Sequence, residues 1–120
     1  MEKNLEISAL LDFYAELLTE NQRQVLTFYY NEDFSLSEIA QNLGITRQGV
    51  HDTIKKAETQ LFEFEKKLQL SRKFNDIEKN LQVIIENSEK LLSLSNGDFD
   101  KIKPIANSIK NVANSIYKSQ

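Results

Sequence analysis

The sequence predicts an all-α protein, and three observations support this fold class. Only 3 Gly and 1 Pro occur in 120 residues, so few positions would interrupt a helix. No segment sustains the alternation of polar and apolar residues that marks a half-buried strand. Apolar residues instead recur at spacings of three and four along most of the chain, which is the spacing of one helical face.

Residues 4–18 predict a first amphipathic helix. Its apolar side is expected to comprise Leu5, Ala9, Leu10, Phe13, Leu17 and Leu18. A second helix is expected to begin at Thr19, whose hydroxyl would cap it while Gln22 completes a capping box. Tyr14, Tyr29 and Tyr30 lie beside phenylalanines at helical spacing, so we expect them in the core or at its edge rather than on a base-stacking surface.

Residues 35–60 predict a helix-turn-helix. Ser35 or Ser37 can cap its first helix, and Glu38 lies three residues after Ser35, as a capping box requires. One apolar face follows, formed by Leu36, Ile39, Ala40 and Leu43. Gly44 supplies the left-handed backbone conformation that ends a helix and turns the chain sharply.

The second helix of this unit is a candidate recognition helix. We expect Ile45 to be buried in the turn and Thr46 to cap the helix. Its apolar stripe consists of Val50, Ile54, Ala57 and Leu61. The outward side of its first turns is rich in hydrogen-bonding and basic side chains, which contact base edges and phosphates in such proteins. The candidate nucleic-acid-binding residues are Thr46, Arg47, Gln48, His51, Lys55 and Lys56.

A plainer interpretation of these residues stays open. Arg47 suits a guanine edge and Gln48 an adenine edge, but both could form an ordinary solvated first turn. Lys55 and Lys56 would reach phosphates or else are surface lysines, and His51 would contact nucleic acid or serve as a half-exposed spacer.

Residues 71–120 predict a pair of helices that follows a helix-turn-helix module of residues 1–70. The seam of the first helix is expected to contain Phe74, Ile77, Leu81, Ile84, Ser88 and Leu91. A turn at residues 96–97 follows, with Asp98 as the cap of the last helix and Pro104 in its first turn. The stripe of that helix comprises Ile102, Ile105, Ala106, Ile109, Ala113 and Ile116. These stripes must pack either on the module or on a second chain, and we expect a homodimer.

Composition and charge argue against several functions. The chain has no Cys and 1 His, which excludes disulfides and thiolate metal sites. It has no apolar segment of membrane-spanning length and no signal-peptide pattern, so we expect a cytoplasmic protein without membrane association. No glycine-rich phosphate loop or nucleophile–base pair occurs, so we expect neither an enzyme nor a cofactor. With a net charge of −3, a monomer would neutralise few phosphates and would bind nucleic acid weakly.

Three segments, residues 18–30, 35–40 and 44–50, resemble region 4 of bacterial sigma factors, which recognises promoters. With its Lys-rich helical C-terminal part, the chain is more similar still to the YlxM-like family of small bacterial proteins with a sigma-like helix-turn-helix. The resemblance implies an all-helical regulatory protein that forms dimers. It also implies a link to the signal recognition particle pathway, whose GTPase is encoded by neighbouring genes. By matching position, it assigns DNA contacts to Arg47, Gln48, His51 and Lys55.

Two hypotheses follow from the sequence. The first is a DNA-binding regulatory protein, for which DNA is favoured over RNA as the ligand. The alternative is an adaptor that does not bind DNA and instead binds a protein or RNA component of the signal recognition particle, through the C-terminal helices.

Overall fold

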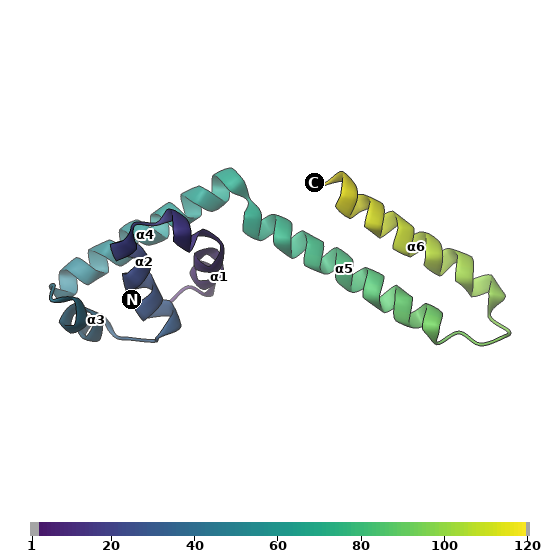
Figure 1. Ribbon diagram of the computed structural model, residues 1–120, viewed down its shortest axis with the longest axis horizontal. Helices are drawn as coiled ribbons and strands as arrows, with labels where there is room; N and C mark the ends of the chain where they lie inside the picture. Colours follow the sequence, from purple (N-terminus) through teal and green to yellow (C-terminus); the bar gives the residue numbers. More distant parts are fainter. Residues whose placement is uncertain (1–2, 120) are drawn as a thin grey trace. The chain divides into compact units, whose positions relative to one another are not determined.

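The computed structural model describes residues 3–119 and confirms the all-α class, because no strand occurs among these residues. The chain divides into two compact units, and the boundary in the sequence lies between Ser71 and Arg72. Each unit is built from consecutive helices, as Figure 1 shows. Within the described part of the chain, no helix combines the length and the apolar content that crossing a membrane requires.

The N-terminal unit is organised around one long helix. Its elements are α1 (Leu5–Tyr14), the 3-10 turn η1 (Ala15–Leu17), α2 (Glu20–Leu26), the π-helical turn η2 (Thr27–Asn31), α3 (Leu36–Leu43) and α4 (Arg47–Leu68). Helix α4 contacts α1, α2 and α3, so each shorter helix packs against a different part of it. The core consists of Ile7, Leu10, Leu11, Tyr14, Leu18, Val25, Leu26, Tyr29, Ile39, Ala40, Val50, Ile54, Ala57 and Leu61.

The first helix differs from its prediction in length and in its buried face. Helix α1 ends at Tyr14, and its buried residues are Ile7, Leu10, Leu11 and Tyr14. These four residues follow the i, i+3, i+4, i+7 spacing of one helical face and include an aromatic ring of large area. The predicted face was wrong at Leu5, Ala9, Phe13 and Leu17, which are all exposed. The expected core position of Tyr14 and Tyr29 is confirmed, and Tyr30 is half-buried.

The predicted caps that delimit the helices of this unit are confirmed. Thr19 and Gln22 form a capping box at α2, and Ser35 and Glu38 form another at α3. Ser35 rather than Ser37 is the cap of α3, with its Oγ accepting from the Glu38 amide at 3.1 Å. Both boxes satisfy amides that a helix start would otherwise leave without a partner.

The turn of the helix-turn-helix is confirmed at two of three positions. Gly44 ends α3 in the left-handed conformation with φ 66°, and the Thr46 hydroxyl caps α4 by accepting from the Gly49 amide at 2.9 Å. The expected burial of Ile45 was wrong, because this side chain is 42% exposed. Leu43, the last residue of α3, packs against the core, whereas Ile45 lies at the outer edge of the turn.

A polar network holds the junction between α4 and the next helix, α5 (Leu70–Leu92). The buried Tyr14 hydroxyl donates to Glu65 Oε1 at 2.7 Å and accepts from the Leu70 amide at 3.0 Å. Glu65 Oε1 also accepts from the Ser71 amide at 3.1 Å. Burial and the Glu65 carboxylate raise the pKa of Tyr14. Gln69, which has φ 54°, makes the turn between the two helices, so side chains of α1 and α4 satisfy the first amides of α5.

The C-terminal unit is a hairpin of α5 and α6 (Phe99–Lys118), which lie side by side (Figure 1). Asn87 Nδ2 donates to Ser108 Oγ at 3.1 Å between the two helices. Neither helix contains a buried residue among those described. Beyond Ser71, partial burial within these helices is confined to Ile77, Asn80, Ile84, Asn87, Ser88 and Leu91 of α5 and to Ile105, Ser108, Ile109, Val112 and Ile116 of α6.

The predicted seam was therefore only partly correct. Several apolar residues assigned to it are exposed, namely Phe74, Leu81, Ile102, Ala106 and Ala113. The apolar stripe of each helix is wider than the surface that two helices can cover between them, and the hairpin uses one edge of it. Asn80, Asn87 and Ser108 are partly buried in the contact between the helices, although the prediction did not include them.

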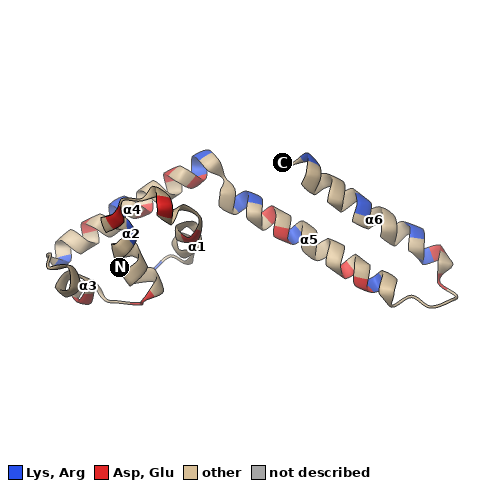
Figure 2. Cartoon of the chain, viewed as in Figure 1, with Lys and Arg blue, Asp and Glu red and all other residues tan. Residues whose placement is uncertain are grey.

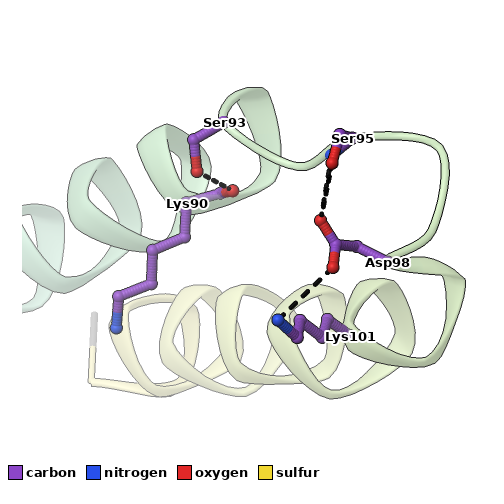
Figure 3. Close-up of polar contacts among 5 residues, drawn as sticks. All are labelled: Lys90, Ser93, Ser95, Asp98 and Lys101. Atoms are coloured by element: carbon purple, nitrogen blue, oxygen red, sulfur yellow. Dashed lines mark hydrogen bonds and ion pairs between the residues drawn. The ribbon is translucent and has the colours of Figure 1, made fainter.

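The connection between α5 and α6 is held by Asp98 (Figure 3). Its carboxylate accepts from the Ser95 amide at 3.0 Å and from the Ser95 hydroxyl at 3.2 Å, and it pairs with Lys101 at 3.3 Å. The Ser95 amide and then Lys101 lower the pKa of Asp98. Before the connection, the Ser93 hydroxyl donates to the Lys90 carbonyl at 2.8 Å.

The predictions about the start of α6 were only partly correct. Asp98 occupies the N-cap position, as expected, but its side chain makes no capping hydrogen bond, because its carboxylate binds Ser95 in the preceding turn. Pro104 lies beyond the first turn, since α6 already begins at Phe99. A proline at this position removes the hydrogen bond that a donor would make to the Asp100 carbonyl, which weakens the start of the helix.

Candidate nucleic-acid interface

The first turns of α4 and the start of α3 enclose a hollow on the surface of the N-terminal unit. Its volume is about 380 Å³, and its lining is formed by Leu36, Arg47, Gln48, His51 and Lys55. Four of the six predicted nucleic-acid-binding residues therefore share one concave surface. In Figure 2, basic residues mark the beginning of α4 near α3.

The sequence of α4 explains why these four side chains lie together. With 3.6 residues per turn, positions 47, 48, 51 and 55 fall on one face of the helix. Val50 and Ile54 lie on the neighbouring face and are fully buried, which fixes the rotation of the helix against the core. The cap at Thr46 and the left-handed Gly44 then fix where this helix starts relative to α3.

Two of the predicted residues lie outside the hollow. The Thr46 hydroxyl is engaged as the cap of α4, so its role in the structure is to position the helix start. Lys56 is exposed and is not part of the lining, because it lies on the next face of α4. The hollow thus combines Arg47 and Lys55 as cations with Gln48 and His51 as hydrogen-bonding groups.

Asp52 holds one side chain of the hollow and lies close to another, although the sequence did not single it out as a site residue. Its Oδ1 accepts from Gln48 Nε2 at 2.9 Å and lies 3.6 Å from His51 Nδ1. Gln48 must direct its amide nitrogen to the carboxylate, since its carbonyl oxygen would be repelled there. The Gln48 Oε1 atom is consequently left as an acceptor. The i, i+4 spacing of Gln48 and Asp52 is the sequence signal that indicates this pair.

His51 contributes an unsatisfied polar atom to the site. Its side chain is 37% exposed, but Nδ1 is buried and has no hydrogen-bond partner among the described residues. A buried polar atom without a partner costs free energy, so such an atom is more often found where a ligand or water completes it. Leu36, which was predicted only as part of the apolar face of α3, forms the apolar wall of the hollow.

Gly49 serves the cap of α4. A Cβ atom built at this position would lie 3.1 Å from the Thr46 hydroxyl oxygen, which is tight for a side-chain contact. A close approach to the preceding helix is not the constraint, since no atom of α3 lies within 4 Å of that Cβ. The absence of a Cβ at Gly49 therefore leaves room for the Thr46 hydroxyl, which accepts a hydrogen bond from the Gly49 amide.

Comparison with known proteins places the chain in a family. Residues 1–102 match the family model UPF0122, described as "Putative helix-turn-helix protein, YlxM / p13 like". The chain belongs to the UPF0122 family. This membership confirms the resemblance to the YlxM-like family.

Relatives of similar length support this membership. A UPF0122 protein of Clostridium kluyveri (strain ATCC 8527) is 46% identical over 104 residues, covering 86% of this chain and 94% of the relative. One of Clostridium novyi (strain NT) is 40% identical over 119 residues, covering 98% of each chain. A UPF0122 protein of Halalkalibacterium halodurans is 43% identical over 100 residues, which is 78% of this chain and 92% of the relative.

Proposed function

We propose that this UPF0122 protein is a DNA-binding regulatory protein whose helix α4 enters the major groove. The observation that carries the proposal is the hollow in which Arg47, Gln48, His51 and Lys55 meet at the start of a capped helix. Recognition helices of helix-turn-helix proteins contact bases through their N-terminal residues. The same surface supports no catalytic assignment, so we propose a binding protein rather than an enzyme.

Each residue of the hollow has a distinct role in this proposal. Arg47 suits the two acceptors of a guanine edge. Gln48, held by Asp52, offers Oε1 to the exocyclic amino group of adenine or cytosine. Lys55 lies two turns into α4 and would contact a phosphate, which positions the helix without selecting a sequence.

The test is titration of the full-length protein against labelled duplex fragments of bacterial genomic DNA at two salt concentrations. Arg47→Ala is expected to weaken binding to a preferred fragment by about 1–3 kcal/mol, because a bidentate base contact is lost. Lys55→Ala should lower the salt slope by about one unit, since one phosphate contact is lost. Lys66→Ala is the matched control, because Lys66 is an exposed cation at the opposite end of α4. Unchanged affinity and salt slope in both test variants would contradict the proposal.

A second candidate function is an adaptor that binds a protein or RNA component of the signal recognition particle. The observation that favours it is the net charge of −3, which is unfavourable for a protein that binds DNA by its charge alone. Binding through the C-terminal helices would not need the residues of the hollow.

One experiment separates the two functions. The full-length protein is titrated with the purified RNA and the purified GTPase of the signal recognition particle, and each titration is repeated with Arg47→Ala. Saturable binding that Arg47→Ala leaves unchanged would support the adaptor. Binding of DNA alone, with loss in Arg47→Ala, would support the regulatory protein and exclude the adaptor.

A further inference from the structure

The C-terminal hairpin exposes large apolar side chains from both of its helices. Exposed fractions are 46% for Leu81, 50% for Ile85, 86% for Leu92, 75% for Phe99, 45% for Ile102 and 81% for Tyr117. In α6, the exposed residues Ala106 and Ala113 lie between these large apolar side chains along the helix. A two-helix unit without a buried residue gains little free energy from apolar burial, and its large exposed apolar surface is typical of a site that binds a partner.

Helical geometry places these side chains on one broad side of the hairpin. Each residue turns the helix by about 100°. In α5, Leu81, Ile85 and Leu92 lie roughly a quarter turn from the residues that contact α6, clockwise when viewed from the N-terminus. In α6, Phe99, Ile102, Ala106, Ala113 and Tyr117 lie the same quarter turn, in the same sense, from the residues that contact α5. Because the helices are antiparallel, equal rotations bring both groups to the same side.

The opposite broad side of the hairpin is polar. On α5 it carries Asp76, Lys79, Glu86 and Lys90 around Val83, and on α6 it carries Lys101, Asn111, Ser115 and Lys118. The hairpin is therefore amphipathic as a unit, with one side suited to water and the other suited to an apolar partner.

We propose that the apolar side binds the same side of a second copy of this chain. The two hairpins would form a four-helix bundle with two-fold symmetry, in which α5 of one copy packs on α6 of the other. If a whole large side chain offers about 200 Å², the exposed fractions amount to on the order of 700 Å² per chain. Two such surfaces bury on the order of 1,400 Å², which is within the range of stable protein–protein interfaces.

Charges at the borders of the apolar side favour this arrangement and a second copy as its occupant. The outer border on α5 carries Glu78 and Glu89, whereas the outer border on α6 carries Lys103 and Lys110. A two-fold axis parallel to the helices sets the acidic border of each copy beside the basic border of the other. A two-fold axis perpendicular to the helices would pair acidic with acidic borders. The surface is thus complementary to itself, as an interface between identical subunits requires.

The first test measures the mass of the full-length protein by sedimentation equilibrium over a range of concentrations. We expect a reversible dimer of the 13.9 kDa chain and a dimer dissociation constant raised at least a hundredfold by Leu81→Glu. Val83→Glu is the matched control, because Val83 is 37% exposed on the polar side of the same helix and should leave the dimer unchanged. A wild-type monomer at all concentrations would overturn the proposal, and so would equal effects of the two variants.

The second test addresses the pairing of α5 with α6. Glu89→Lys and Lys110→Glu are each expected to raise the dissociation constant about tenfold, because each creates two like-charge contacts. The double variant should return to within about twofold of the wild type. Both positions are exposed, so far-UV circular dichroism should show intact helices. Single variants without effect, or a double variant no better than the singles, would overturn this pairing. Neither test contains nucleic acid, so their outcomes do not depend on the proposed function.

Discussion

The two units of this protein use similar amphipathic helices with opposite results. In the N-terminal unit, α1, α2 and α3 surround α4, so its apolar stripe is covered along Val50, Ile54, Ala57 and Leu61. In the C-terminal unit, each helix has one neighbour, and no described residue of either helix is buried. An apolar stripe therefore predicts that one face of a helix will be packed against other elements. The number of helices that pack against it within the chain decides how much of that face is buried.

Truncation of one isoleucine in each unit should give the largest contrast. Ile54→Ala removes a fully buried side chain from the centre of the core and should lower the free energy of unfolding by about 2–5 kcal/mol. Ile84→Ala removes a half-buried side chain from the hairpin seam and should cost about 1 kcal/mol. Urea unfolding followed by circular dichroism measures both. Equal losses would mean that the hairpin is as well packed as the N-terminal unit.

The junction network offers a second contrast, between a buried and an exposed tyrosine. Tyr14→Phe removes the hydroxyl that the Leu70 amide and Glu65 use, so it should cost about 1–3 kcal/mol of stability. Tyr117→Phe is the control, because Tyr117 is 81% exposed within one chain, and at a protein concentration that keeps the chain monomeric it should change the stability by less than about 0.5 kcal/mol. Thermal unfolding of both variants is the measurement. A Tyr14→Phe protein as stable as the wild type would show that the network contributes little.

Two glycines at turns should respond differently to substitution. Gly44→Ala forces a side chain into the left-handed conformation and should destabilise the N-terminal unit by about 1–2 kcal/mol. Gly97→Ala, in the hairpin connection, meets open space and needs no left-handed backbone, so a change below about 0.5 kcal/mol is expected. Chemical denaturation of both proteins would show whether the turn of the helix-turn-helix is the more demanding one.

The smallest expected effect is the response to acid of one carboxylate in each unit. The pKa of Glu38 is lowered from 4.5 by bonds with Ser35, and the pKa of Asp98 is lowered from 3.8 by Ser95 and Lys101. A lowered pKa in the folded state stabilises the fold above the ordinary pKa, and this contribution is lost as the pH falls through the lowered value. Glu38→Gln and Asp98→Asn should each make stability less dependent on pH between about pH 5 and 2. Unfolding curves at several pH values measure this slope, and an unchanged slope in either variant would contradict the assigned bonds.

Local signals made the N-terminal unit predictable. The residues of the capping boxes, Gly44 and Thr46 interact only with residues a few positions away, so their geometry can be predicted from the sequence alone. The spacing of positions 47, 48, 51 and 55 likewise placed four site residues on one face. The use of Asp52 to hold Gln48 was missed because its outward position suggested only solvent.

Features that depend on distant contacts were harder to predict. Ile45 was expected inside the turn, but only the packing of Leu43 decides which of the two is covered. In the hairpin, the stripes were wide enough to allow several rotations, so the seam at Asn80 and Asn87 could not be chosen from spacing. Glu65 and Tyr14 are 51 positions apart in sequence, and no local pattern connects them.

The junction network also bears on how the chain folds during synthesis. A ribosome releases the N-terminal residues first, and domains generally fold in that order. When residues 70–71 emerge from the ribosome, Tyr14 and Glu65 have already emerged and can bind their amides. The start of α5, which belongs to the N-terminal unit, would then form on hydrogen bonds from residues that are already folded, which lowers the cost of nucleating this helix.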